Sequence, residues 1–480
     1  MPFEGNPAAE LVEELQVTFS PALYLERRGW VLEILRRERV RQVLDVGCGE
    51  GELIGCICNP APWLSGPLAS IVPSTISIGR RSKYMEYTAS VNSRQDVTDD
   101  VDDFLHINIL HGLDISPSDL KDAVQAVSAR DADSLSDWQV RWEPLDVKIW
   151  MGDLGVYNEE FMDIECIVAT EVIEHLPENS LENFAPVLLG LYHPRMLLIT
   201  TPSYTFNARF TPPNAPPGTR KGFLDPTKRT DRIFRHDDHK FEWTVEEFAS
   251  WCRGTADQWD YEVDIGGVGQ AQEDDPWGRD SELGFASQTA AFRRKDGAEY
   301  AQRRAQNCDS LGLPQSMSNR NPHVLLADSH HLPDSAANQP IPLVDIAVAV
   351  KSKMEVFQTG TVLFRDLWFE KDISTLCGGW IEVLVAAVTQ HTDLVLTQMG
   401  TEHGSRWEVL FPGFVPRPPS SRALSSDAGH LDEDEMEDEY TESMADDAAS
   451  GWPSFEGPSL NTSNDYDSAL GWGDPHLAWQ

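Results

Sequence analysis

The sequence has no apolar run that approaches the roughly 20 residues needed to span a membrane. Its first residues, MPFEGNPAAELVEEL, lack both the basic segment and the long apolar segment of a signal peptide. The seven cysteines show no C-x-x-C spacing, and their odd number argues against a disulfide framework. We therefore expect a protein without membrane segments and with reduced cysteines, located in the cytoplasm or, as the alternative, in the nucleus.

Positive charge is missing from the end of the chain, where residues 425–480 contain no Lys or Arg but many Asp and Glu. This stretch supplies much of the formal charge of −40, so the net charge says little about the folded part. A segment of like charge repels itself and cannot bury enough apolar area to fold. We predict a disordered acidic tail over residues 417–480 and a flexible N-terminus over residues 1–16.

The remaining chain contains short apolar runs that alternate with helical patterns. A packing helix is expected over residues 23–39, and two closely spaced strands, YEVDIGGVG and QTAAFRRKD, come last. The main strands are expected within residues 40–54, 107–116, 147–154, 162–170 and 195–202. This alternation predicts an α/β domain over residues 17–298, with a Rossmann-like, doubly wound, mostly parallel sheet and an antiparallel edge.

Three segments fall outside this pattern. Residues 59–103 are rich in Ser, Pro and Asp and separate a helix from the strand that should follow it within about 20 residues, so we interpret them as an insertion at the rim of the sheet. Residues 299–340 are polar and are predicted to be a linker. Residues 341–416 are apolar again and are predicted to form a small helical module, to which no chemistry can be assigned.

The stretch D-V-G-C-G-E-G, residues 45–51, lies between a predicted strand and a predicted helix, where glycines let a ligand approach the backbone. Carboxylates at the ends of the next two strands are placed to contact ribose hydroxyls and an adenine edge. The set resembles the cofactor site of class I S-adenosylmethionine-dependent methyltransferases. The candidate cofactor-binding residues are Asp45, Gly47, Gly49, Asp114 and Asp153.

A second motif, T-E-V-I-E-H-L, follows the fourth predicted strand. If it begins a helix, Glu171, Glu174 and His175 fall within an arc of roughly 100° on one turn. Carboxylates and an imidazole suit Mg²⁺ or Mn²⁺ better than a structural zinc. The alternative is that these residues start a helix without binding metal, as in methyltransferases that act on small molecules, so a further ligand is needed to decide.

That ligand is indicated by R-H-D-D-H-K-F-E-W-T, residues 235–244. Together with E-x-x-E-H it resembles the HEN1-type small RNA 2′-O-methyltransferases, and the segments F-S-P-A-L-Y-L-E-R-R and T-T-P-S-Y-T-F-N look like further parts of that family. The resemblance implies that Glu171, Glu174, His175 and His239 bind a divalent cation and are the catalytic residues. It implies methyl transfer to the 2′-hydroxyl of the 3′-terminal nucleotide of small silencing RNAs, which protects their 3′ ends.

Such a cation would lower the pKa of the 2′-hydroxyl and fix its position, provided that the sugar offers a free vicinal diol. The loop between the two motifs is basic and is predicted to contact RNA phosphates. Its cations are Arg209, Arg220, Lys221, Lys228, Arg229, Arg232 and Arg235. We also expect a monomer that takes the 3′ end of a small RNA, with an Argonaute-type silencing protein as a partner.

Two other functions are compatible with the sequence. One is a metal-independent class I methyltransferase that acts on a small molecule or a protein, with E-V-I-E-H-L as a bystander. The other is a noncatalytic RNA-binding or scaffold protein that has kept the fold. The intact glycine turn and the complete set of two glutamates and two histidines argue against the second.

Overall fold

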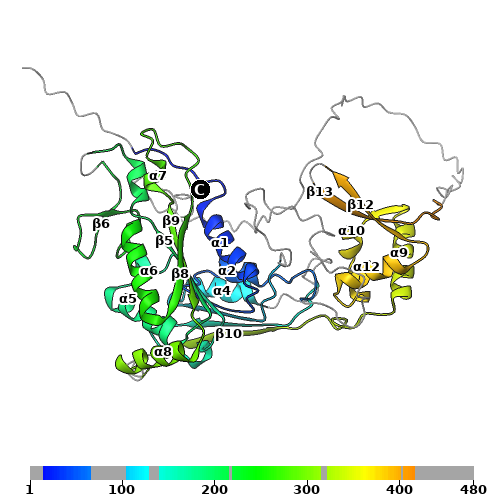
Figure 1. Cartoon of the computed structure of the whole chain (residues 1–480), viewed down its shortest axis with the longest axis horizontal. Coiled ribbons are helices and arrows are strands. Elements are labelled where there is room, and N and C mark those ends of the chain that lie inside the picture. Colours follow the sequence, from blue (N-terminus) through cyan, green and yellow to red (C-terminus); the bar gives the residue numbers. More distant parts are fainter. Residues whose placement is uncertain are drawn as a thin grey trace, which may run out of the picture. The chain divides into compact units, whose positions relative to one another are not determined.

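The computed structural model describes residues 14–65, 104–128, 140–215, 219–314, 322–401 and 404–416 (Figure 1). Most of the predicted flexible N-terminus (residues 1–13), most of the predicted rim insertion (residues 66–103) and the predicted acidic tail (residues 417–480) lie outside the described residues. These three parts of the domain organisation stay predictions. No helix in the described residues is both long and apolar enough to cross a membrane.

Within the described residues, the largest sheet has eight strands in the order β10-β3-β2-β1-β4-β5-β9-β8. Its members are β1 (Gln42–Val46), β2 (Ile109–Asp114), β3 (Leu145–Met151), β4 (Cys166–Thr170), β5 (Met196–Pro202), β8 (Tyr261–Val268), β9 (Ser287–Arg294) and β10 (Val324–His331). The strands from β3 to β5 in this order pair in parallel. Strand β9 pairs antiparallel with β5 and with β8, and β10 pairs antiparallel with β3. The predicted Rossmann-like, mostly parallel sheet is confirmed, including its antiparallel edge.

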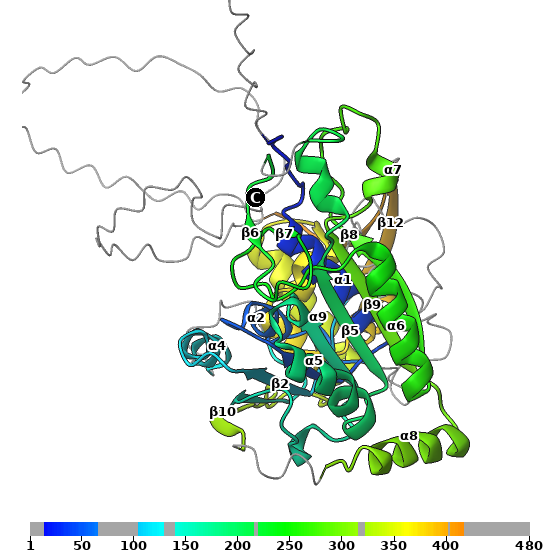
Figure 2. The same ribbon diagram turned by 90° about the vertical axis from the view of Figure 1, so that its left-hand side faces the viewer.

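Both faces of the sheet are covered, which explains why its central strands are apolar runs without alternation. Val43 of β1 packs with one set of helices and Leu44 with the other. The first face carries α1 (Leu23–Arg37), α2 (Glu52–Ile57) and α4 (Asp119–Val127). The second carries α5 (Glu178–Ala185), the π-helix η3 (Pro186–Leu191), α6 (Val245–Trp259) and α8 (Ala298–Ser310) (Figures 1 and 2).

The start of α6 is fixed by a capping box. The Thr244 hydroxyl accepts a hydrogen bond from the backbone N–H of Glu247, and the Glu247 carboxylate accepts one from the backbone N–H of Thr244. This arrangement satisfies two amides that the first turn of a helix leaves unpaired. It also anchors the end of the histidine-containing loop that precedes α6.

The structure corrects the predicted linker at residues 299–340. This range contains α8, which packs against the second face of the sheet, and β10, which pairs antiparallel with β3 as the edge strand. Strand β10 has no fully buried side chain, and its sequence, VLLADSHH, changes from apolar to polar residues instead of forming one continuous apolar run. The sheet domain therefore continues to about residue 331.

The C-terminal module also differs from a purely helical one. It contains α9 (Leu343–Val356), α10 (Phe364–Trp368), α11 (Lys371–Leu376) and α12 (Ile381–Gln390). It also contains a sheet of the strands β11 (Thr361–Leu363), β12 (Val395–Thr401) and β13 (Gly404–Leu410), in the order β11-β13-β12. The sequence analysis missed this sheet because each of its strands is short or partly polar.

Residues far upstream complete the core of this module. The indoles of Trp142 and Trp368 both donate to the backbone oxygen of Pro62, at 3.1 and 3.0 Å. Trp63 and Leu64 are buried in the same cluster, and the Leu64 amide donates to the oxygen of Gly379. The first residues of the predicted rim insertion therefore pack within the module.

Gly51 should be replaceable only at a cost in stability. Its φ is +83°, and an added Cβ would lie 2.8 Å from the Cα of Ala123 in α4. We expect Gly51→Ala to lower the free energy of unfolding by about 1–3 kcal/mol. Urea denaturation measures this free energy.

Gly254 supplies the matched control, because it lies within α6 and an added Cβ would meet no atom within 4 Å. Gly254→Ala should raise the free energy of unfolding by about 0.5–1 kcal/mol through helix propensity. Equal shifts for the two variants would contradict the close packing of α2 against α4.

Candidate active site

The turn from β1 to α2 requires glycine for two separate reasons. Gly47 and Gly49 have φ values of +70° and +52°, which most side chains avoid. An added Cβ at Gly47 would lie 2.5 Å from a methyl group of Val172. Val172 belongs to E-V-I-E-H, so the glycine turn and the second motif are in direct contact.

Asp114, at the end of β2, holds this turn in place. One of its carboxylate oxygens accepts a hydrogen bond from the Gly49 amide at 2.9 Å, and the other accepts one from the Ser116 amide at 2.8 Å. Asp45, at the opposite end of the turn, is buried, and its Oδ1 has no hydrogen-bond partner. Burial, reinforced by the charge of Asp114, raises the pKa of Asp45 to about 8.

Asp153 follows β3, beside the end of β2. Its Oδ1 accepts a hydrogen bond from the Gly155 amide, and the neighbouring Gly152 amide donates to the oxygen of Asp114. The structure thus brings the predicted cofactor residues to the carboxyl ends of three adjacent strands. The position and the buried, unpaired oxygen of Asp45 fit the predicted S-adenosylmethionine, whose amino group can donate to a carboxylate.

The second motif does not form the helical turn that the sequence analysis assumed. Glu171 has a φ of +54°, and its amide donates to the backbone oxygen of Thr200. A short 3₁₀ helix, η2 (Ile173–His175), follows, and α5 begins only at Glu178. The arc of about 100° is therefore the wrong reason for grouping these side chains, because Glu171 stands outside the helix.

The two glutamates of this motif have different environments. Glu171 accepts a hydrogen bond from the Thr200 hydroxyl at 2.8 Å and pairs with Arg27 of α1 at 2.9 Å. Glu174 is fully buried; its Oε2 accepts a hydrogen bond from the Thr201 hydroxyl, and its Oε1 has no partner. Burial, with a further contribution from the charge of Glu171, raises the pKa of Glu174 well above its usual range.

Two imidazoles lie beside Glu174, with their ring centroids 4.9 Å apart. His175 Nδ1 lies 2.9 Å from the carboxylate of Asp238, and His239 Nδ1 lies 2.8 Å from that of Glu242. His175 Nε2 faces Glu174 Oε1 at 3.8 Å. A carboxylate on Nδ1 favours the tautomer that leaves the Nε2 lone pair open to a ligand.

These residues fit a divalent cation. The candidate ligand atoms of Glu174, His175 and His239 all lie within 4.8 Å of one another. Burial lowers the pKa of His175 to about 4, so its ring is neutral at neutral pH, as metal binding requires. Glu171 does not belong to this close group, although it is near enough to affect the pKa of Glu174. A second group, His236, Asp238 and His239, shares one histidine with the first.

The sequence analysis missed the residues that support this group, although it quoted the segments that contain them. Glu242, from H-K-F-E-W, is buried and also accepts hydrogen bonds from the Asn207 side chain at 2.6 Å and from the Arg235 amide at 2.8 Å. Asn207 comes from T-T-P-S-Y-T-F-N and Arg27 from F-S-P-A-L-Y-L-E-R-R. The resembling segments outside the two motifs thus meet at the site.

Several of the predicted RNA-binding cations have structural roles. Arg209 is buried, pairs with Asp280 and donates to the backbone oxygen of Glu273. The Arg235 guanidinium pairs with Glu14 at 3.1 Å and lies 3.9 Å from the centre of the Phe210 ring. We therefore do not expect Arg209 and Arg235 to contact RNA.

The other predicted cations are more accessible. Arg232 makes two hydrogen bonds with Glu247, and both Arg232 and Arg220 lie over the ring of Tyr204. Lys221, Lys228 and Arg229 are exposed. Because some of these cations are buried and others are exposed, the described cations of the basic loop do not form one cationic surface.

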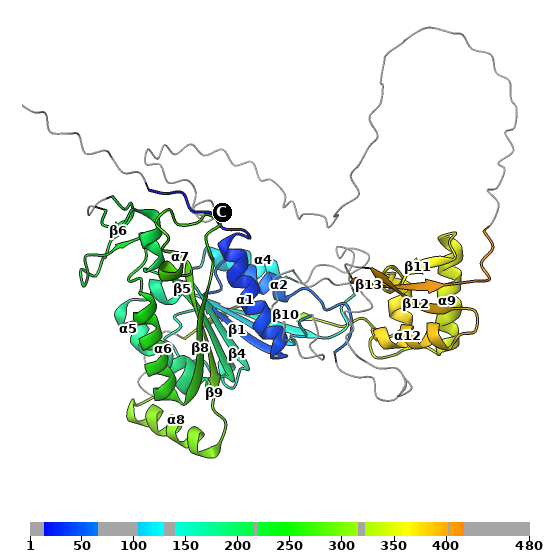
Figure 3. The same cartoon turned by 45° about the horizontal axis from the view of Figure 1, so that its top comes forward.

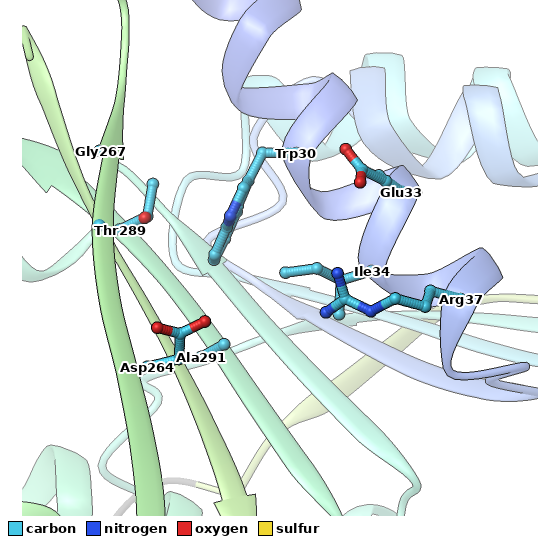
Figure 4. A pocket seen from close by; sticks show the side chains of 9 residues that line it. Trp30, Glu33, Ile34, Arg37, Asp264, Gly267, Thr289 and Ala291 are labelled. Carbon is cyan, nitrogen blue, oxygen red and sulfur yellow. The ribbon is translucent and has the colours of Figure 1, made fainter. Parts of the chain in front are cut away.

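A separate pocket of about 160 Å³ lies between α1 and the strands β8 and β9 (Figure 4). The indole of Trp30 extends from the helix towards Asp264 and Ala291 on the sheet. The lining residues are Trp30, Glu33, Ile34, Arg37, Asp264, Gly266, Gly267, Thr289 and Ala291. None of the predicted site residues contributes to it, so this pocket is distinct from the candidate active site.

Comparison with known proteins supports the family resemblance that the two motifs indicated. The chain is 26% identical over 293 residues to a small RNA 2′-O-methyltransferase of Gallus gallus, covering 61% of this chain and 58% of that protein. It is 26% identical over 285 residues to the enzyme of the same name from Schizosaccharomyces pombe, covering 58% of this chain and 62% of that protein. The predicted resemblance to the small RNA 2′-O-methyltransferases is confirmed.

The chain spans less than two thirds of the length of either of these relatives of the small RNA 2′-O-methyltransferase family. No protein-family model matches the chain. The crystal structure of the small RNA methyltransferase HEN1 superposes with a TM-score of 0.41 and 23% identity, covering 66% of this chain and 29% of that one. That structural likeness is too distant to add to the argument.

The raised pKa of Asp45 predicts a pH-dependent cost to stability. Its pKa is about 8 in the folded protein against 3.8 in the unfolded chain, so the unfolded state loses the proton first as pH rises. Between these values Asp45 lowers the free energy of unfolding by up to about 1.4 kcal/mol per pH unit. Asp45→Asn removes the effect.

We therefore expect the cofactor-free Asp45→Asn variant to gain more stability over the wild type at pH 8 than at pH 5. Urea denaturation at the two pH values measures the difference. A gain that is the same at both values would show that Asp45 is ionised in the folded protein throughout this range.

Proposed function

We propose that the protein transfers the methyl group of S-adenosylmethionine to the 2′-hydroxyl of the 3′-terminal nucleotide of small RNAs and so protects their 3′ ends. The observation that carries this proposal is the meeting of Glu174 and His175 with His239, which lies more than sixty residues downstream. Val172, between the two glutamates, packs on the glycine turn. The segment that carries Glu174 and His175 therefore also contacts the candidate cofactor turn. The names of the sequence relatives support the reaction and the substrate.

The cofactor would lie along the carboxyl ends of β1, β2 and β3. Asp45 would accept hydrogen bonds from its amino group, Asp114 from its ribose and Asp153 from its adenine edge. Since Asp114 already fixes the Gly49 amide, it would position the turn and the ribose together. Binding of the ammonium group next to Asp45 would favour the ionised carboxylate and lower its pKa.

Glu174, His175 and His239 would hold a divalent cation, Mg²⁺ or Mn²⁺, with Glu171 as the fourth predicted ligand. When bound, such a cation would lower the pKa of a coordinated hydroxyl and align two vicinal oxygens of the terminal ribose. The protein's own contribution is to orient the two imidazoles through Asp238 and Glu242, while burial keeps the ring of His175 neutral. The alternative role for His175 or His239 is to accept the hydroxyl proton, which requires an Nε2 lone pair that does not bind the cation.

A metal-independent methyltransferase acting on a small molecule or a protein is the alternative. The Arg27–Glu171 ion pair favours it, because that carboxylate is already neutralised without a cation. The buried Glu174 oxygen without a partner favours the metal-dependent reading more strongly, since such an oxygen costs about 1–3 kcal/mol unless a ligand satisfies it.

The remaining features of the proposal concern the cellular setting. We propose that the protein acts as a monomer in the cytoplasm or the nucleus and receives its RNA from an Argonaute-type silencing protein. These features rest on the resemblance to the family alone.

The first test uses synthetic small RNAs that end in 2′-OH/3′-OH, 2′-deoxy, 3′-deoxy or 3′-phosphate. Labelled methyl transfer should occur on the free diol and fall at least about 100-fold on the 3′-deoxy and 3′-phosphate ends, because only a vicinal diol offers two oxygens to one cation. The 2′-deoxy end, which lacks the acceptor, measures the background. A chelator should abolish transfer to the diol, and added Mg²⁺ or Mn²⁺ should restore it.

Equal labelling of the diol and the 3′-deoxy ends would contradict the diol mechanism. Full activity in the chelator would favour the metal-independent alternative.

A second test concerns Glu242, which we regard as the residue that positions His239. In Glu242→Gln the amide oxygen cannot accept all three hydrogen bonds that the carboxylate accepts, and a neutral amide holds the His239 N–H more weakly than a carboxylate does. We expect the affinity for Mn²⁺, followed by electron paramagnetic resonance, to fall about 10- to 100-fold. The affinity for S-adenosylmethionine should not change, because Glu242 does not contact the glycine turn.

Glu246→Gln, on the exposed first turn of α6, is the matched control and should bind both ligands like the wild type. Wild-type Mn²⁺ affinity in a folded Glu242→Gln protein would refute the positioning role.

A further inference from the structure

A small hairpin projects from the sheet domain on the side of the candidate active site, away from α8 (Figures 1 and 3). We call residues 222–235 the hairpin; it is built on β6 (Phe223–Leu224) and β7 (Ile233–Phe234), which pair antiparallel. Phe223 and Leu224 are 47% and 73% exposed, whereas Phe234, opposite Phe223, is buried. Two consecutive large apolar residues are thus exposed, on opposite faces of the hairpin because successive side chains of a strand alternate.

The exposure of these side chains is not the result of a loosely held loop. Asp225, directly after Leu224, is buried and accepts four hydrogen bonds, from the amides and hydroxyls of Thr227 and Thr230, at 2.6–3.0 Å. Arg232, on the returning strand, makes two hydrogen bonds with Glu247 at the start of α6. A framework of this kind holds the apolar pair outward, which is a common property of ligand-binding surfaces.

The base of the hairpin is joined to the candidate metal group. The Arg235 amide donates to Glu242 Oε1 at 2.8 Å, and the same oxygen lies 2.8 Å from His239 Nδ1. On the other side, Arg229 pairs with Glu178, which begins α5 three residues after His175. The hairpin is therefore fixed next to the place where the terminal ribose would bind.

Charge indicates what the apolar pair would contact. Lys228 is exposed, and no ion pair to it is found among the described residues. Arg229 and Glu178 form a pair in which the side chains are 48% and 70% exposed; such pairs are weak and can exchange for a phosphate. Exposed aromatic and aliphatic side chains on the same hairpin as two accessible cations suit a single-stranded nucleic acid, whose bases stack while its phosphates bind cations.

We propose that Phe223 and Leu224 form a docking site for the unpaired nucleobases at the 3′ end of the RNA, with Lys228 and Arg229 contacting the adjoining phosphates. This inference rests on the proposed function and specifies which part of the RNA the protein recognises. It implies that the enzyme prefers an unpaired 3′ end, because bases that are stacked on both sides within a duplex cannot present a face to Phe223.

The test compares the full-length wild type with a Phe223→Ala/Leu224→Ala double variant on single-stranded small RNA. We expect both the dissociation constant, from fluorescence anisotropy, and the KM for methyl transfer to rise roughly tenfold through lost stacking. The kcat at saturating RNA and the affinity for S-adenosylmethionine should stay unchanged. Phe223→Trp should bind RNA like the wild type, because the indole keeps an aromatic face.

Leu332→Ala is the matched control, since this leucine is 80% exposed and follows the edge strand β10. It should leave all four quantities unchanged. A second arm uses a blunt duplex of the same sequence, on which the double variant and the wild type should differ less than twofold.

Wild-type affinity of the double variant for single-stranded RNA would overturn the docking site, as would an equal loss on the single strand and the blunt duplex. These outcomes are separate from a failure of the proposed function. If the wild type transferred no methyl group to any RNA, the proposed function would fail, whereas an active wild type with an equally active double variant would refute the hairpin alone.

Discussion

The candidate site depends on one buried oxygen, Oε1 of Glu174, that has no hydrogen-bond partner in the protein. Thr201 satisfies the other oxygen of this carboxylate, and burial favours its neutral form. An unsatisfied buried acceptor costs about 1–3 kcal/mol, and a ligand that binds this oxygen would remove that cost. The two imidazoles that lie beside this oxygen make a cation a suitable ligand, because their Nδ1 atoms are already held by carboxylates.

A direct contact keeps the cofactor turn and the candidate metal group together. Val172 fills the space that a side chain at Gly47 would occupy, and it stands between the two glutamates in the sequence. A change in the glycine turn would therefore disturb the segment that carries Glu174. Direct contact of this kind allows a bound methyl donor and a bound ribose to approach each other in a fixed geometry, which methyl transfer requires more than it requires a strong base.

The basic loop shows why charge alone is a weak guide to an RNA-binding surface. Arg209 and Arg235 look like RNA ligands in the sequence, yet in the fold both pair with acidic residues and Arg235 also covers the ring of Phe210. Lys221, Lys228 and Arg229 remain exposed, and Lys228 and Arg229 belong to the same hairpin as the exposed apolar residues Phe223 and Leu224. Recognition of RNA in this chain therefore follows from which side chains the hairpin holds outward.

The sequence by itself determined the parallel sheet and the glycine turn with Asp45 and Asp114, because strand periodicity and glycine turns depend on neighbouring residues. The grouping of Glu174, His175 and His239 was a prediction from the resemblance to a known family. Sequence patterns failed for the edge strand β10, whose residues do not form one continuous apolar run. Only the tertiary structure decided that Glu171 pairs with Arg27, that Glu242 supports His239, and that Trp63 and Trp142 belong to the C-terminal module. These contacts join residues that are far apart in the chain or that lie in an irregular loop. A local sequence pattern does not show that such residues are close in space.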